Sequence, residues 1–95
     1  MTRTYLDWNA TTPLHPEAKA AMVAAMEVVG NPSSVHAEGR AAKALLEKSR
    51  AKIAAALGAE GADIVFTSGA TEAASLACAG RGLACAAVEH DAVAA

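Results

Sequence analysis

Aromatic side chains are scarce in this sequence, since Phe, Trp and Tyr make up only 3% of its 95 residues. A core must therefore be built from alanine and from Leu, Ile, Val and Met, and small side chains each bury little area. A chain of this length buries only about 60 to 65% of its unfolded surface when it folds alone. We expect one modest core, as in a slice of a larger α/β protein.

The sequence also lacks a strong excess of either charge and has no long hydrophobic run. The net charge is −2, which gives no attraction to nucleic acid, and no apolar stretch fits a signal peptide or a membrane span. The hydrophobic fraction of 54% excludes a disordered segment. We therefore expect a cytoplasmic protein without nucleic-acid or membrane partners. Five basic residues gather on the polar side of one predicted helix, which favours a solvated face over a binding patch. They are Arg40, Lys43, Lys48, Arg50 and Lys52.

Cysteine is limited to Cys78 and Cys85, too few for a disulfide framework and without partners at metal-ligand spacing. We predict no metal site. The surrounding Ala, Leu and Gly favour two buried thiols. A nucleophilic cysteine would need a neighbour that lowers its thiol pKa, and only Arg81 is close in sequence.

Helical spacing of apolar residues predicts a first helix from Pro16 to about residue 29. A tight loop is expected over 30–34. The same spacing predicts a second helix from His36 or Gly39 to Leu57. Gly58 is its expected stop. A third helix is predicted over 73–79, and Asp91 is the expected cap of a fourth.

Two apolar runs of strand length, 64–67 and 83–88, flank the third helix. Strand, helix and strand with short connections are typical of a parallel sheet, so the predicted fold class is α/β. We expect an arm and helices over 1–58 and the beginning of an α/β domain over 59–95. The last residues resemble the first turn of an unfinished element, which we interpret as truncation.

The most informative motif is Phe66-Thr67-Ser68-Gly69-Ala70-Thr71-Glu72, a predicted strand end that opens a helix. Backbone N–H groups of Gly69, Ala70 and Thr71 would suit a phosphate at the positive end of that helix. The Walker and dinucleotide patterns are absent. A plain helix cap made by Ser68 and Thr71 fits the segment equally well.

His90 follows the second predicted strand. The carboxyl ends of adjacent parallel strands face one crevice, so this ring could lie over a ligand held at the Gly69 turn. A solvent-satisfied strand-end histidine is the simpler interpretation of His90 alone.

Taken together, four ordered segments resemble the cysteine desulfurases, in the class V aminotransferase group of fold type I pyridoxal-phosphate enzymes. The segments are Leu6-Asp7-Trp8-Asn9-Ala10-Thr11-Thr12-Pro13, Gly30-Asn31-Pro32-Ser33-Ser34-Val35-His36, the motif over 66–72, and Glu89-His90. The resemblance implies the start of the parallel-sheet cofactor domain and pyridoxal 5'-phosphate as cofactor.

By position, the resemblance implies that Ala70 and Thr71 bind the cofactor phosphate, with Gly69 in the same turn, and that His90 stacks on the pyridine ring and assists proton transfer. Asn9, Thr11, Asn31 and Ser33 are weaker candidates near the active-site mouth. The family's cofactor-binding lysine, its ring-nitrogen aspartate and its mobile cysteine match no position in the chain.

The function implied by the resemblance is conversion of L-cysteine to alanine and an enzyme-bound persulfide, for iron–sulfur cluster or thio-cofactor synthesis. A homodimer and a sulfur-acceptor or scaffold protein are the implied partners. A selenocysteine lyase or an aminotransferase of the same group is the alternative enzyme. A non-catalytic interaction module is the alternative of another class.

Overall fold

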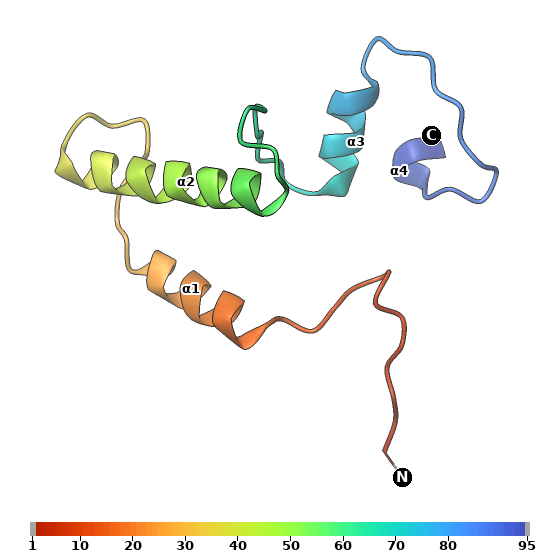
Figure 1. The fold of residues 1–95 in the computed structure, drawn as a ribbon, viewed down its shortest axis with the longest axis horizontal. Coiled ribbons are helices and arrows are strands. Elements are labelled where there is room, and N and C mark those ends of the chain that lie inside the picture. Colours follow the sequence, from red (N-terminus) through yellow and green to blue (C-terminus); the bar gives the residue numbers. More distant parts are fainter. Residues whose placement is uncertain (1, 95) are drawn as a thin grey trace. The chain divides into compact units, whose positions relative to one another are not determined.

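The computed structural model describes residues 2–94, which contain four helices and no strand (Figure 1). The helices are α1 (Pro16–Met26), α2 (Ala37–Ala56), α3 (Ala70–Cys78) and α4 (Asp91–Ala94). All four predicted helices are thus confirmed, with small differences at their ends. None of the described helices is long and apolar enough to cross a membrane.

Helix α1 begins where Pro16 places a fixed φ at a first-turn position that needs no hydrogen bond from its nitrogen. Glu17 adds a negative charge at the positive end of the helix dipole. The helix stops at Met26, three residues before the predicted end, and none of its residues is buried.

Helix α2 has well-defined signals at both ends. The His36 ring accepts a hydrogen bond from the Gly39 N–H at its start. At its end the Ala59 N–H donates to the Ala54 carbonyl at 2.8 Å and the Gly58 N–H donates to the Ala55 carbonyl at 3.1 Å. Gly58 has a φ of 63°, so this is a Schellman motif at the predicted stop.

The loop over 30–34 lies directly against the first turn of α2, and two glycines make this approach possible. A Cβ on Gly30 would lie 2.2 Å from the Glu38 carbonyl oxygen, and one on Gly39 would lie 2.3 Å from that of Ser34. Neither distance is possible for a real Cβ, so both positions require glycine for space alone.

The core is small, as the composition predicted. Ala42 and Ala54 of α2 are the buried hydrophobic residues among those described. Larger apolar side chains remain exposed, for example Leu6 at 83% and Val29 at 81%. Burial of two alanines contributes little, so hydrogen bonds within the helices carry much of the local order.

The two expected strands are not formed among residues 2–94, which is a correction to the sequence-based prediction. A strand exists only when a neighbouring strand completes its hydrogen-bond ladder, and local β propensity cannot replace that neighbour. The 83–88 run is also interrupted, because the Glu89 N–H donates to the Ala86 carbonyl at 3.2 Å and closes a turn. Val65 is 70% exposed and Val88 is 92% exposed, so neither run is buried.

The chain divides into two compact units, one up to Glu60 and one from Gly61 onward. Helices α1 and α2 belong to the first, and α3 and α4 to the second. The functional division into an arm with helices over 1–58 and the beginning of a cofactor domain over 59–95 stays a prediction.

Candidate functional site

The turn before α3 presents backbone N–H groups to open space. Gly69 is the N-cap residue, in an extended conformation, and Ala70 and Thr71 are the first two helical residues. Within residues 2–94, no backbone or side-chain acceptor faces the N–H groups of these three residues. A Cβ built on Gly69 would meet no atom within 4 Å, so an anion could approach this turn closely.

Ser68 and Glu72 close one side of the turn. The Glu72 carboxylate accepts the Ser68 N–H at 3.1 Å and the Ser68 hydroxyl at 2.6 Å. The hydroxyl bond, followed by the backbone bond, lowers the pKa of Glu72 below its ordinary value. Glu72, the third residue of the helix, accepts both bonds, so the arrangement is one half of a capping box, displaced by one residue toward Ser68. It stabilises the helix start and also places a negative charge beside the candidate anion site.

The structure therefore combines features of both interpretations of this motif. Ser68 supports the helix start through Glu72, as a structural role requires, while the Thr67 hydroxyl donates to the Gly69 carbonyl at 2.9 Å and fixes the turn. Gly69 has no side chain that could cap α3, so the first N–H groups of this helix stay available.

His90 immediately precedes α4 and caps it. Its Nδ1 accepts the Ala92 N–H at 3.1 Å, and its carbonyl accepts the N–H groups of Val93 and Ala94. The expectation that Asp91 would be the cap was wrong, because Asp91 is already helical. The imidazole nitrogen reaches the same backbone position that a capping carboxylate would.

Helices α3 and α4 contact each other within the second unit. In Figure 1 both helices begin at the lower end of this unit as it is drawn. The described residues form no parallel sheet. The starts of α3 and α4, which the predicted sheet was expected to bring to one edge, nevertheless lie at that same end.

The weaker candidates lie in two turns of the first unit. Around Asn9, the N–H groups of Ala10 and Thr11 approach the Asp7 carbonyl at 3.2 and 3.5 Å. The Tyr5 hydroxyl bridges the Asp7 and Thr11 carbonyls at 2.7 and 3.2 Å. The side chains of Asn9 and Thr11 are exposed.

Asn31 organises the second turn. Its Oδ1 accepts the Ser33 N–H at 2.9 Å, and its carbonyl accepts the Ser34 N–H at 2.9 Å. This Asx turn leaves the Ser33 hydroxyl exposed beside α2.

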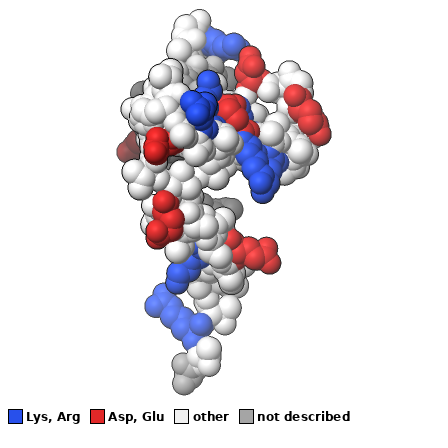
Figure 2. Space-filling model, turned by 90° about the vertical axis from the view of Figure 1, so that its left-hand side faces the viewer, with Lys and Arg blue, Asp and Glu red and all other residues white. Residues whose placement is uncertain are grey.

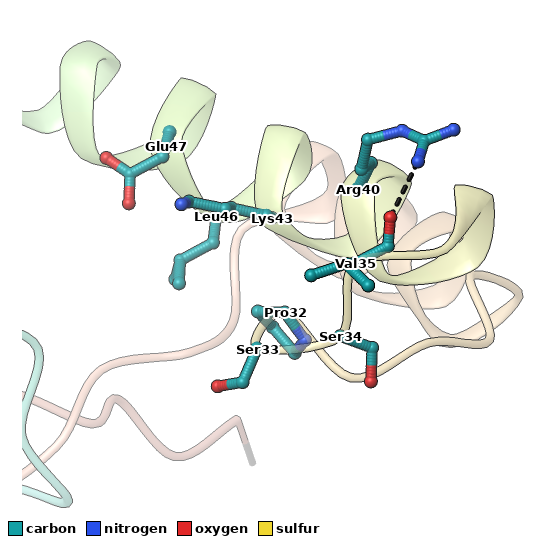
Figure 3. Close-up of a pocket in the computed structure, with 8 residues that line it drawn as sticks. All are labelled: Pro32, Ser33, Ser34, Val35, Arg40, Lys43, Leu46 and Glu47. Carbon is teal, nitrogen blue, oxygen red and sulfur yellow. Dashed lines mark hydrogen bonds between the residues drawn. The ribbon is translucent and has the colours of Figure 1, made fainter.

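Ser33 lines a groove of about 480 Å³ whose wall includes Arg40 and Lys43 (Figure 3). The Arg40 guanidinium donates to the Val35 carbonyl at 2.6 Å, which ties the loop to α2. Both cations were expected on a solvated face, and both are exposed where they line this groove. On the face shown in Figure 2, basic and acidic side chains are interspersed rather than segregated by sign.

The cysteines differ from the prediction of two buried thiols. Cys85 is exposed and Cys78 is half-buried. The 83–88 run that carries Cys85 has no sheet neighbours in the described part of the chain, so its side chains are not covered. No group of three or more His, Cys, Asp or Glu among the described residues could hold a metal ion.

The family model of the class-V aminotransferases matches residues 4–93, and the chain belongs to this family. The resemblance deduced from the four motifs is therefore confirmed. Enzymes of this family depend on pyridoxal phosphate in general and share the type I fold. No solved structure matches the chain.

Curated relatives include an IscS-like cysteine desulfurase of Mycobacterium tuberculosis, 47% identical over 76 residues, or 80% of this chain and 19% of the relative. The cysteine desulfurase IscS of Dictyoglomus turgidum is 48% identical over 77 residues, or 80% of this chain and 20% of the relative. The human selenocysteine lyase is 48% identical over 75 residues, or 78% of this chain and 17% of the relative. The chain spans about a fifth of the length of these proteins.

Proposed function

We propose that this chain supplies the phosphate-binding start of a pyridoxal-phosphate-dependent cysteine desulfurase. The observation that supports it best is the open turn at Gly69, Ala70 and Thr71, in a chain that is about 47% identical to a cysteine desulfurase. In this proposal the runs over 64–67 and 83–88 become strands of the type I parallel sheet once neighbouring strands are present.

The residues of the turn fit a phosphate group. Three adjacent backbone N–H groups at a helix start are suitable donors, and the Thr71 hydroxyl adds a side-chain donor. The absence of a Cβ on Gly69 leaves room for phosphate oxygens against the backbone. The Glu72 carboxylate opposes this, because it repels a phosphate at the same helix end. Its two bonds to Ser68 fix the carboxylate and lower its pKa, so a phosphate at this turn must bind beside a charged Glu72.

When bound, pyridoxal phosphate supplies the electron sink for chemistry at the amino-acid substrate. The protein's part is to hold and orient it. Gly69, Ala70 and Thr71 would bind the phosphate, and His90, which precedes the helix that contacts α3, would lie over the ring. Asn9, Thr11, Asn31 and Ser33 would lie near the substrate entrance.

The proposed substrate is L-cysteine, with alanine as one product and the sulfur left on the enzyme as a persulfide for iron–sulfur or thio-cofactor synthesis. A homodimer, a sulfur-acceptor protein and a cytoplasmic location are part of the proposal by resemblance. Selenocysteine lyase is the second candidate, because the human enzyme of that name is 48% identical over the matched residues.

A chimera tests the proposal. Residues 4–93 of this chain, the range that the family model matches, replace their counterpart in the Dictyoglomus turgidum cysteine desulfurase, and release of alanine from L-cysteine and from L-selenocysteine is measured. We expect the chimera to retain the cofactor and to act on L-cysteine. A chimera that folds but does not retain pyridoxal phosphate would contradict the proposal, and strong preference for L-selenocysteine would favour the second candidate.

Thr71→Ala in the chimera tests the phosphate cup. Loss of a hydrogen bond to a charged group costs about 1.5 to 3 kcal/mol, so the dissociation constant of the cofactor should rise about 10- to 150-fold. Excess pyridoxal phosphate should restore most of the activity. Thr4→Ala, at an exposed position outside every candidate turn, is the matched control and should change neither affinity nor activity.

A further inference from the structure

The groove beside Ser33 lies between loop residues 32–35 and one face of α2. The side chains that line it from the helix are Arg40, Lys43, Leu46 and Glu47. Residues three and four positions apart share one side of a helix, so these four form a single face. In Figure 3 the Leu46 side chain points from α2 toward the loop. The volume of about 480 Å³ is in the range of sites that hold a ligand.

The loop wall of this groove is fixed by contacts within the chain. The Arg40 guanidinium donates to the Val35 carbonyl at 2.6 Å, and Asn31 closes an Asx turn through its side-chain oxygen. The Ser34 carbonyl lies so close to Gly39 that no Cβ could stand between them. The groove is therefore formed before anything binds, and a partner loses little free energy in ordering the loop.

Two cations set the sign of the charge in the groove. Arg40 and Lys43 are both exposed, and Lys43 has no hydrogen bond or ion pair within residues 2–94. Arg40 has five N–H donors, most of which remain after its bond to the loop. The acidic residue of the lining, Glu47, is paired with Arg50 at 3.2 Å. The groove consequently favours a negatively charged group.

Apolar side chains lie beside these cations. Val35 is 88% exposed although its loop is fixed, and Pro32 and Leu46 line the same groove. An inorganic anion would meet the cations but leave these three side chains in water. A segment that carries carboxylates and apolar side chains would satisfy both parts of the surface. Arginine next to apolar contact area is also typical of protein interfaces.

We propose that the groove beside Ser33 is a docking site for an acidic peptide segment of a partner protein. Carboxylates of the segment pair with Arg40 and Lys43, and its apolar side chains cover Val35 and Leu46. The proposal does not depend on the proposed function, because the groove lies in the first unit and needs neither the cofactor nor the turn before α3. A net charge of −2 disfavours nucleic acid, whose binding relies on a larger excess of cations.

The test is a titration of a fluorescently labelled decapeptide, containing four Glu and three Leu residues, with the 95-residue chain. Fluorescence anisotropy reports binding. Two analogues separate the contributions: every Glu is replaced by Gln in the amide analogue, and every Leu by Ser in the serine analogue. We expect saturable binding of the parent peptide and weaker binding of both analogues. Equal binding of the amide analogue, or no saturation up to about 1 mM, would overturn the proposal.

Substitutions of Lys43 test the charged half. An exposed ion pair is weak, so Lys43→Gln should raise the dissociation constant of the parent peptide about 1.5- to 5-fold. Lys43→Glu replaces attraction by repulsion, which squares the effect to about 2- to 25-fold. Lys48→Gln is the matched control, because it removes the same charge from the same helix outside this groove. An equal loss of affinity in Lys48→Gln would show attraction to overall charge and overturn the proposal.

Val35→Ser tests the apolar half. It should weaken the parent peptide up to about tenfold and leave the serine analogue unaffected. Val29→Ser is the matched control, since Val29 is 81% exposed and does not line the groove. Affinity for the parent peptide that is unchanged in Val35→Ser, or lowered equally in both variants, would overturn the proposed apolar contact.

Amide shifts of the 15N-labelled chain locate the bound peptide. We expect the shifts to gather at Val35, Arg40 and Lys43, with the second unit unaffected. Shifts confined to the second unit would overturn the proposal. A single-stranded oligonucleotide that binds more tightly than the peptide, and is weakened by Lys43→Gln, would assign the groove to nucleic acid instead and would likewise overturn it.

Discussion

Replacement of Gly39 by alanine tests the contact between the 30–34 loop and α2. The new Cβ would lie 2.3 Å from the Ser34 carbonyl oxygen and 2.7 Å from the Ser34 Cβ. Because both are close to the backbone, no flexible side chain can move aside, and the loop must retreat by roughly 1 Å to restore van der Waals contact. The substitution thus strains a buried position of the helix.

The free energy of unfolding should fall by about 1 kcal/mol. Overpacking of this kind costs about 1 to 3 kcal/mol, and alanine recovers up to about 1 kcal/mol through its better helix propensity. Gly61→Ala is the matched control, since a Cβ there would meet nothing within 4 Å. It should be neutral or stabilising by up to about 1 kcal/mol.

Urea titration followed by far-UV circular dichroism measures both variants, and amide shifts of Ser33 and Ser34 report the loop. We expect destabilisation and shifted loop amides in Gly39→Ala only. Stability at or above that of the parent with unshifted loop amides would refute the close approach. Equal destabilisation by Gly61→Ala would show a general effect of losing glycine.

Three further predictions concern Glu72 and the cysteines. The folded-state pKa of Glu72 is lowered, so the stability from its bonds to Ser68 is complete above the ordinary carboxyl pKa and is lost as pH falls through the lowered value. A helicity or stability difference between the parent and Glu72→Gln should therefore shrink in that acidic range, and a difference that grows there would contradict the capping role. Exposed Cys85 should react with a maleimide faster than half-buried Cys78, as judged from the single Cys→Ser variants, and the reverse order would contradict the structure. Cys85→Ser in the chimera should leave desulfurase activity unchanged, since Cys85 lies outside every candidate turn, and loss of activity in a folded, cofactor-bound variant would show otherwise.

The helices could be predicted from the sequence because their signals are local. Pro16 fixes the first turn of α1, and Gly58 adopts the positive φ that ends α2. The spacing of the apolar residues indicates the body of each helix. The strands could not be settled in this way, since a ladder depends on partners distant in the sequence.

The site was predictable to a similar extent. Gly69 and Thr71 occupy the expected helix start because a small-residue turn followed by an alanine-rich stretch is a local pattern. The cap by His90 was missed, because histidine is an uncommon cap residue and only its distance to Ala92 reveals the role. The groove beside Ser33 was missed as well, since it depends on how the loop folds back over α2.

The central claim, that the start of α3 is a phosphate site for the cofactor, is tested most directly by titrating the 15N-labelled chain with pyridoxal phosphate and following its amide resonances. One helix end supplies a few charge-assisted bonds against the cost of immobilising a ligand, so binding should be roughly millimolar. Ala70→Pro is the decisive variant: proline is tolerated at a first helical position, and it removes one N–H of the cup. The account predicts saturable shifts at Gly69, Ala70 and Thr71, weakened in Ala70→Pro, with the capped start of α2 unaffected. Shifts confined to lysine-bearing parts of α2, with the α3 start unchanged, would contradict it.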